Sequence, residues 1–127
     1  MAVRAFAKRT RLASGFLYVW TGLLQGDSGA PVPCGVAHGG SLQVLGTFGG
    51  ATLRLEGANF LDDPNADANW AVVVNPSMGT LDVVAASIST VGEILPVLMR
   101  PRVIGGDGTT DLTVRLRLAV YSAPSLM

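Results

Sequence analysis

The clearest pattern in the sequence lies in residues 41–57, SLQVLGTFGGATLRLEG, where apolar and polar residues alternate. Such alternation is typical of strands with one buried face, because successive side chains point to opposite sides of a sheet. Gly49 and Gly50 lie between the two alternating runs and can take the positive φ angles of tight turns. We therefore predict a β-hairpin at the centre of a sheet. Its inward side chains are Leu42, Val44, Ala51, Leu53 and Leu55.

Similar alternating or short apolar runs recur along the chain and predict further strands. These strands cover residues 15–24, 70–74, 81–86, 96–105 and 111–121. Pro101 interrupts one of them, which predicts a sheet edge or a bulge. Ser87 could cap a short helix in residues 87–95, although Gly92 disfavours that interpretation. Residues 25–40 and 60–69 are rich in turn-forming residues and are predicted to be loops.

Seven or eight short strands joined by Gly- and Pro-rich turns predict an all-β fold, an antiparallel β-sandwich or jelly roll. We expect one such domain over residues 14–127, preceded by an extended N-terminal arm at residues 1–13 that holds a helical turn or an edge strand. Residues 105–118 repeat the plan of residues 46–57, with Gly105 and Gly106 at the turn. The sequence therefore predicts two similar hairpins.

Charge is sparse and unevenly placed. Charged residues make up 14% of the chain and hydrophobic residues 49%, against about 25% charged residues in ordinary soluble domains. This composition favours a surface that is partly buried in an assembly. Four of the nine basic residues fall in the first eleven positions, so we expect this basic arm to contact an acidic partner surface or nucleic acid, or else to be a solvated terminus. They are Arg4, Lys8, Arg9 and Arg11.

Two segments resemble sites of chemistry and are interpreted as turns. Residues 26–31, GDSGAP, resemble the nucleophile segment of chymotrypsin-like proteases, but no histidine precedes Ser28 and His38 is the chain's single histidine. Residues 62–69 place side-chain oxygens at alternate positions, as calcium loops do, yet lack the glycine and the glutamate of such loops. We therefore expect neither an enzyme nor a cofactor or metal site.

The remaining candidates have structural interpretations. Cys34 is the chain's single cysteine, which excludes an internal disulfide, fits a reducing cytoplasm and suggests a small apolar filler. Residues 12–24 are too short and too diluted by polar residues for a membrane span or a signal peptide. Trp20 and Trp70 lie in apolar runs and are predicted to be core residues. Five further arginines could form an exposed stripe toward an acidic partner or nucleic acid: Arg54, Arg100, Arg102, Arg115 and Arg117.

Three stretches together resemble a known family. Residues 20–32 (WTGLLQGDSGAPV), 40–70 (GSLQVLGTFGGATLRLEGANF…NW) and 99–118 (MRPRVIGGDGTTDLTVRLRL) are similar to small virion proteins of tailed bacteriophages. Within that group the chain looks most like the head-decoration, or cement, proteins of short-tailed phages such as the Bordetella phage.

The resemblance implies a non-enzymatic jelly roll or β-sandwich that is made in the host bacterial cytoplasm. It would bind the outside of the virion and staple neighbouring copies of the major capsid protein, often as a homodimer, without touching nucleic acid or membrane. On this view the basic arm contacts the capsid and sheet edges mediate self-association.

Two alternatives remain open. Residues 53–73 (LRLEGANF…NWAVV) resemble a strand-loop-strand of discoidin-like jelly rolls, which suggests a carbohydrate- or host-binding module. An exposed aromatic pair would favour that function, and buried tryptophans would weaken it. The second alternative is a tail or neck adaptor of the virion, which a ring assembly would favour.

Overall fold

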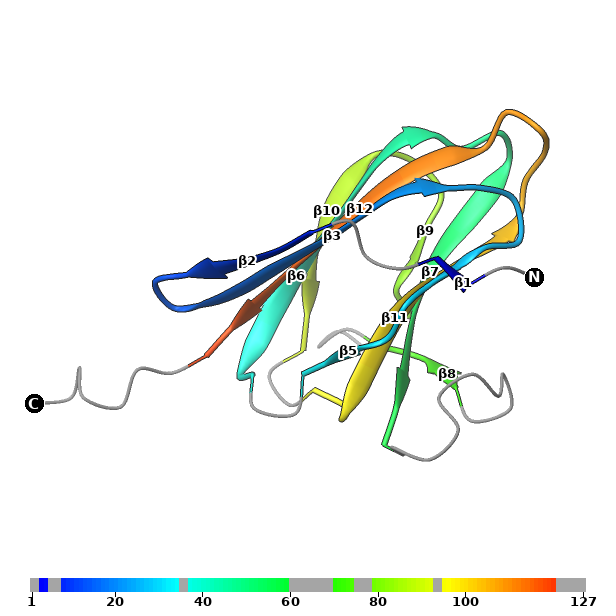
Figure 1. The fold of residues 1–127 in the computed structure, drawn as a ribbon. Coiled ribbons are helices and arrows are strands. Elements are labelled where there is room, and N and C mark those ends of the chain that lie inside the picture. The colour runs from blue at the N-terminus through cyan, green and yellow to red at the C-terminus, as the bar shows by residue number, and fades with distance from the viewer. Residues whose placement is uncertain are drawn as a thin grey trace, which may run out of the picture.

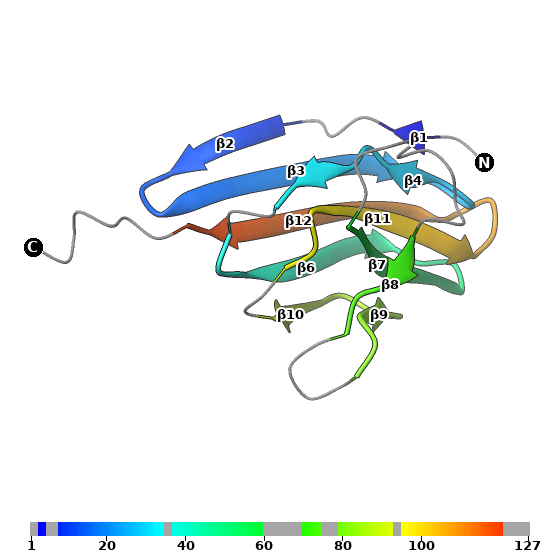
Figure 2. The same cartoon turned by 90° about the horizontal axis from the view of Figure 1, so that it is seen from below.

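The computed structural model describes residues 3–4, 8–34, 37–59, 70–74, 79–92 and 95–120. Every regular element in these residues is a β-strand, and the strands form two sheets that lie face to face, as in a β-sandwich (Figures 1 and 2). The prediction of an all-β fold built from two mainly antiparallel sheets is therefore confirmed.

The first sheet has five strands, each antiparallel to its neighbours, in the order β10-β6-β12-β3-β2. The strands are β2 (Lys8–Leu12), β3 (Gly15–Leu23), β6 (Gly39–Thr47), β10 (Ser87–Val91) and β12 (Asp111–Ala119). We call it the five-stranded sheet.

The second, seven-stranded sheet is built on the long antiparallel pair β7 (Ala51–Ala58) and β11 (Leu98–Gly105). Short strands flank this pair. They are β1 (Val3–Arg4), β4 (Ser28–Gly29), β5 (Val32–Pro33), β8 (Ala71–Val72) and β9 (Asp82–Val83). Only the β1–β4 pairing is parallel among the described strands.

Neither predicted hairpin forms. β6 belongs to the five-stranded sheet and β7 to the seven-stranded sheet, so residues 48–50 turn a corner between the sheets. The β11–β12 connection makes a second corner in the opposite direction. The prediction was wrong because a hairpin and a corner share one signature, a glycine turn between two strands that each bury alternate side chains. The turn glycines all have positive φ: Gly49 (57°), Gly50 (82°), Gly105 (69°) and Gly106 (96°).

The two corners lie side by side, because β6 pairs with β12 in one sheet and β7 pairs with β11 in the other. The buried Thr110 links them: its hydroxyl donates to the backbone oxygen of Phe48 at 2.8 Å and accepts from the N–H of Asp107 at 3.0 Å. The sequence similarity between residues 46–57 and 105–118 thus corresponds to two adjacent structural corners.

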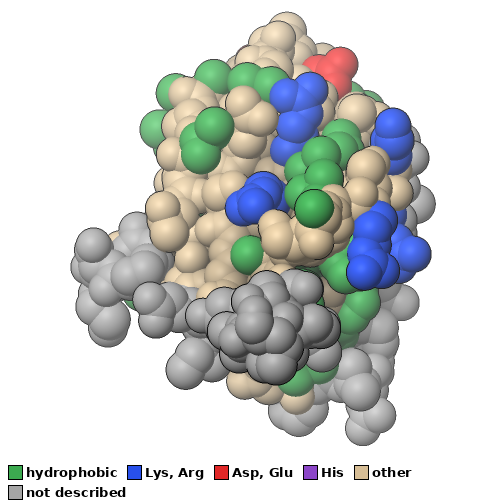
Figure 3. All heavy atoms as spheres, turned by 90° about the vertical axis from the view of Figure 1, so that its left-hand side faces the viewer, with side chains coloured by type: hydrophobic (Ala, Val, Ile, Leu, Met, Phe, Trp, Pro, Cys, Tyr) green, Lys and Arg blue, Asp and Glu red, His purple; other side chains and the backbone are tan. Residues whose placement is uncertain are grey.

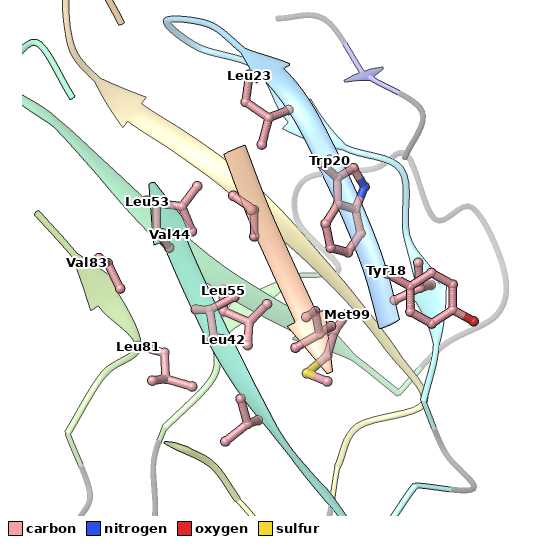
Figure 4. Close-up of a cluster of buried hydrophobic side chains, with 14 of the residues drawn as sticks. Tyr18, Trp20, Leu23, Leu42, Val44, Leu53, Leu55, Leu81, Val83 and Met99 are labelled. Atoms are coloured by element: carbon pink, nitrogen blue, oxygen red, sulfur yellow. The ribbon is translucent and has the colours of Figure 1, made fainter. Parts of the chain in front are cut away.

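The core fills the space between the sheets (Figure 4). Trp20 is fully buried and donates its indole N–H to the backbone oxygen of Ala30 at 3.2 Å. The alternating residues predicted to point inward do so on β6 and β7, and β3 and β12 bury alternate side chains in the same way. Buried side chains from these strands and their neighbours include Tyr18, Leu23, Leu42, Val44, Leu53, Leu55, Leu81, Val83, Met99, Leu112, Val114 and Leu116.

Pro101 does not mark an edge, since β11 pairs with β7 along its whole length and with β4 and β5 on its other side. On that second side the N–H of Val103 donates to the backbone oxygen of Asp27 at 2.8 Å. Backbone N–H groups two residues apart along a strand point to the same side, so an N–H at position 101 would point to the same side as that of Val103. Pro101 has no N–H, and its position lies opposite the gap between β5 and β4. Proline is tolerated there because no partner strand needs a donor.

Several predicted boundaries also change. Ser87 begins strand β10 and not a helix. The predicted loop at residues 25–40 contains β4 and β5, and the strands predicted at residues 70–74 and 81–86 shorten to β8 and β9. Residues 60–69 and 121–127 lie outside the described residues, and so does the possible calcium loop.

The predicted N-terminal arm contributes strands to both sheets. Residues 3–4 form β1, and residues 8–12 form β2, the outermost strand of the five-stranded sheet on that side (Figure 2). Of the two local structures considered for the arm, an edge strand is the one found in its described part.

Candidate partner-binding surface

The structure separates the four basic residues of the N-terminal segment. Arg4 lies in β1 of the seven-stranded sheet, where its backbone pairs with Gly29. Lys8, Arg9 and Arg11 lie in β2 of the five-stranded sheet and are exposed. The four residues are therefore divided between the two sheets.

Strand alternation divides the three cations of β2 between two faces. The guanidinium groups of Arg9 and Arg11 both lie 5.5 Å from the ring centroid of Phe16, which packs against the core. Lys8 and Thr10 must then point to the opposite side, away from the other sheet. Only Lys8 of the β2 cations therefore belongs to the solvent-facing side of the five-stranded sheet.

Two cross-strand rows cover that side. In register they read Lys8–Val19–Arg115–Gln43–Ile88 and Thr10–Leu17–Arg117–Ser41–Thr90. We call these ten residues the outer face. The first row is braced by a hydrogen bond from Arg115 Nη1 to Gln43 Oε1 at 3.3 Å, and it ends at Ile88, which is 68% exposed.

The outer face is basic. Its ten residues include three basic ones, Lys8, Arg115 and Arg117, and no acidic one, while Asp111 lies at the start of β12. Figure 3 views the side of the molecule where these strands lie and shows Lys and Arg side chains interspersed with apolar ones, with the acidic colour confined to its upper rim. Cations spaced by apolar side chains suit an acidic surface that also carries exposed apolar groups.

The other three arginines of the predicted stripe lie on the seven-stranded sheet and are paired within the chain. Arg54 binds both carboxylate oxygens of Asp82, at 2.8 and 3.1 Å, and this hydrogen bonding raises the pKa of Arg54. Arg100, whose side chain is 2% exposed, lies 3.0 Å from Glu56, and Arg102 lies 3.8 Å from the same carboxylate. The prediction of a single exposed stripe of five arginines is therefore wrong.

Trp70 covers the buried ion pair. Its ring lies 4.5 Å from the Arg100 guanidinium, and it packs in a small second cluster with Ala58 and Leu98. The two tryptophans are thus buried in different places, Trp20 in the main core and Trp70 on the seven-stranded sheet. Trp70 is 8% exposed.

The protease-like segment folds as a turn followed by a strand. The carboxylate of Asp27 accepts a hydrogen bond from the backbone N–H of Leu24 at 2.8 Å, and the backbone N–H of Asp27 donates to the backbone oxygen of Leu24 at 3.0 Å. Ser28 is fully buried in β4, between β1 and β11. His38 lies elsewhere, with its N–H donating to the Ala119 oxygen at the end of β12.

The thiol of Cys34 is buried and donates to the backbone oxygen of Pro96 at 3.0 Å. Burial raises the pKa of this thiol to about 12, which disfavours the reactive thiolate. Within the described ranges, no three His, Cys, Asp or Glu residues gather in a way that could hold a metal ion.

Among the described residues there is no helix that is long and apolar enough to span a membrane.

Sequence reasoning identified Arg115 and Arg117 as exposed but could not place them on the same sheet face as Lys8, because that placement depends on the order of strands in the sheet.

In comparisons with known proteins, no protein-family model and no curated protein matches this chain.

Proposed function

We propose that this chain is a non-enzymatic structural protein of a tailed-phage virion, a jelly-roll variant of the β-sandwich. It would bind the outside of the capsid and link neighbouring major capsid subunits. The observation that carries the proposal is the outer face, where Lys8 and Arg115 lie in one cross-strand row and Arg117 in the next, with Val19 and Leu17 on the strand between β2 and β12. The two corners between the sheets support the jelly-roll assignment, since jelly rolls pass successive strands from one sheet to the other.

A broad sheet face that carries both cations and apolar side chains suits a large protein partner. Strands lie about 4.8 Å apart and residues two apart along a strand about 7 Å, so the three cations, on β2 and β12, lie within an area of about 10 Å by 7 Å on one half of the outer face. Complementary charge would steer the protein to an acidic capsid surface. A homodimer associating through a sheet edge would bind two subunits at once and gain avidity through effective concentration.

The carbohydrate-binding alternative has less support. Both tryptophans are buried, and the large hydrophobic residues exposed in the described part of the chain are aliphatic: Leu24, Val74, Val84 and Ile88. Sugar-binding sites of that kind need an aromatic face open to solvent. The tail or neck adaptor would use the same outer face, so its position on the particle is what separates it from a decoration protein.

Charge variants of the outer face test the proposal. Arg115→Gln and Arg117→Gln, combined, should lower occupancy on purified capsids about tenfold at physiological salt and by less at high salt, because screening already weakens the wild-type contact there. Thr52→Glu is the control, since it shifts the net charge in the same direction on the opposite sheet, where Thr52 pairs with Ile104.

Equal occupancy of the double variant and the wild type would refute the proposed face. Point substitutions are preferable to deleting residues 2–11, because that deletion removes β1 and most of β2, and with them part of each sheet.

A further inference from the structure

A pocket of about 250 Å³ lies between the two sheets, on the side opposite the outer face. β3 and β12 line it with Phe16, Tyr18 and Leu118, and the facing wall includes Cys34 and Val97. Arg9 is the charged residue in the lining. A largely apolar cavity with a cation at its border suits a ligand that combines an apolar body with an anionic group.

Arg9 and Arg11 both lie beside Phe16, a residue that lines this pocket. Both guanidinium groups lie 5.5 Å from the centroid of one ring, that of Phe16, so two like charges share one aromatic support. Neither arginine forms an ion pair within the described residues. Carboxylates of a partner placed against them could accept bidentate hydrogen bonds from the planar guanidinium groups.

The third feature is the strand that carries these arginines. β2 is the last strand of its sheet, and in the described part of the chain its second edge pairs with no strand. An extended peptide can add to such an edge through backbone hydrogen bonds, while its alternate side chains reach one face. Residues opposite Arg9 and Arg11 would then lie on the pocket side of the sheet.

We infer that the β2 edge and this pocket bind an extended segment of a partner protein that carries acidic side chains at two alternate positions and a bulky apolar side chain at the next position on the same face. The carboxylates would pair with Arg9 and Arg11, and the apolar side chain would enter the pocket. The inference rests on the proposed function only for the identity of the partner, which would be the major capsid protein.

Cations on an edge strand have a second known role, which is to discourage pairing between sheet edges. That role predicts no preference for acidic segments with apolar side chains and no involvement of the pocket. The two roles therefore give different results with the same peptide.

The probe is the peptide acetyl-Thr-Glu-Thr-Glu-Thr-Phe-Thr-amide, whose two Glu side chains and Phe side chain occupy alternate positions and share one face when it is extended. Titration into the labelled protein should shift the NMR signals of Phe16 and Leu118, with a dissociation constant on the order of 1 mM. The matching peptide with Gln in place of Glu should bind at least about fivefold more weakly.

Two substitutions in the same strand form a matched pair. Arg9→Gln and Lys8→Gln each remove one positive charge from β2, but on opposite faces of the sheet. Arg9→Gln should weaken binding of the Glu peptide about fivefold, whereas Lys8→Gln should leave it unchanged. Ala37→Leu, which adds carbon atoms at the pocket wall, should also weaken binding.

The inference is overturned if the Glu and Gln peptides bind alike, if Arg9→Gln and Lys8→Gln have equal effects, or if the shifts map to the outer face. It is also overturned if 3-phenylpropionate binds the pocket and the peptide does not, because the pocket would then take small carboxylates. Peptide binding that depends on Arg9, together with capsid occupancy that is insensitive to Arg115 and Arg117, would support this site while refuting the proposed outer-face function.

Discussion

Removing the buried cation Arg100 is expected to destabilise the fold strongly. Arg100 lies 3.0 Å from Glu56 and 4.5 Å from the Trp70 ring, and its side chain is 2% exposed. Arg100→Met would leave Glu56, also buried, with only the more distant Arg102. Breaking a buried pair from one side costs about 3–5 kcal/mol, and the remaining Arg102 contact lowers our expectation to about 2–4 kcal/mol.

Equilibrium urea unfolding, followed by circular dichroism and tryptophan fluorescence, measures this cost. For 127 residues a loss of about 3 kcal/mol corresponds to a fall of about 10 °C in the melting temperature. The double variant Glu56→Leu/Arg100→Met should recover most of the loss, because an apolar pair leaves no buried charge without a partner. Arg54→Met is the control, since the Arg54–Asp82 pair is partly exposed and should matter much less.

The reasoning is refuted if Arg100→Met costs less than about 1 kcal/mol. A double variant at least as unstable as the sum of its two single variants would refute it as well. Either result would mean that Glu56 and Arg100 are not coupled as their geometry implies.

Three further predictions concern the corners and the thiol. Gly46→Ala should lower the free energy of unfolding by at least about 3 kcal/mol, because φ is +115° and the new carbon would collide with the Asp111 backbone oxygen. Gly50→Ala, with open space around it, should lower it by only about 1 kcal/mol. Urea unfolding of both variants checks the difference. Thr110→Val should cost about 1–2 kcal/mol by removing the link between the corners, and a midpoint equal to that of the wild type would contradict this. Burial raises the pKa of Cys34 from 9.0 to about 12. As the pH rises, the thiol therefore ionises in the unfolded chain before it ionises in the folded one, so the free energy of unfolding should fall between pH 9 and pH 12. Cys34→Ala should flatten that decline, and a pH profile equal to that of the wild type would contradict the raised pKa.

The sequence was informative wherever burial depends only on alternation. Leu42, Val44, Leu53 and Leu55 were expected to point inward, and all four are buried. The same alternation could not distinguish a hairpin from a corner, because both need a glycine turn and two half-buried strands. Which sheet a strand joins depends on its partners, and those lie far away in the chain.

The candidate sites were less accessible from sequence for a related reason. Arg9 and Arg11 belong to a basic cluster in the sequence, but their stacking on Phe16 and their separation from Lys8 follow from strand register. The pocket collects residues from several separate segments and so has no local signature. Arg100 looked like a surface cation because nothing near it in sequence reveals that Glu56 and Trp70 surround it.

The central claim is that this chain decorates a phage capsid, and cryo-electron microscopy of purified particles tests it most directly. Particles would come from cells that express this chain together with its neighbouring structural genes. We predict density on the outer shell at icosahedral two- or threefold positions, with the five-stranded sheet facing the capsid. Density confined to a tail vertex would contradict the decoration role in favour of an adaptor, and particles without the protein would contradict virion membership altogether.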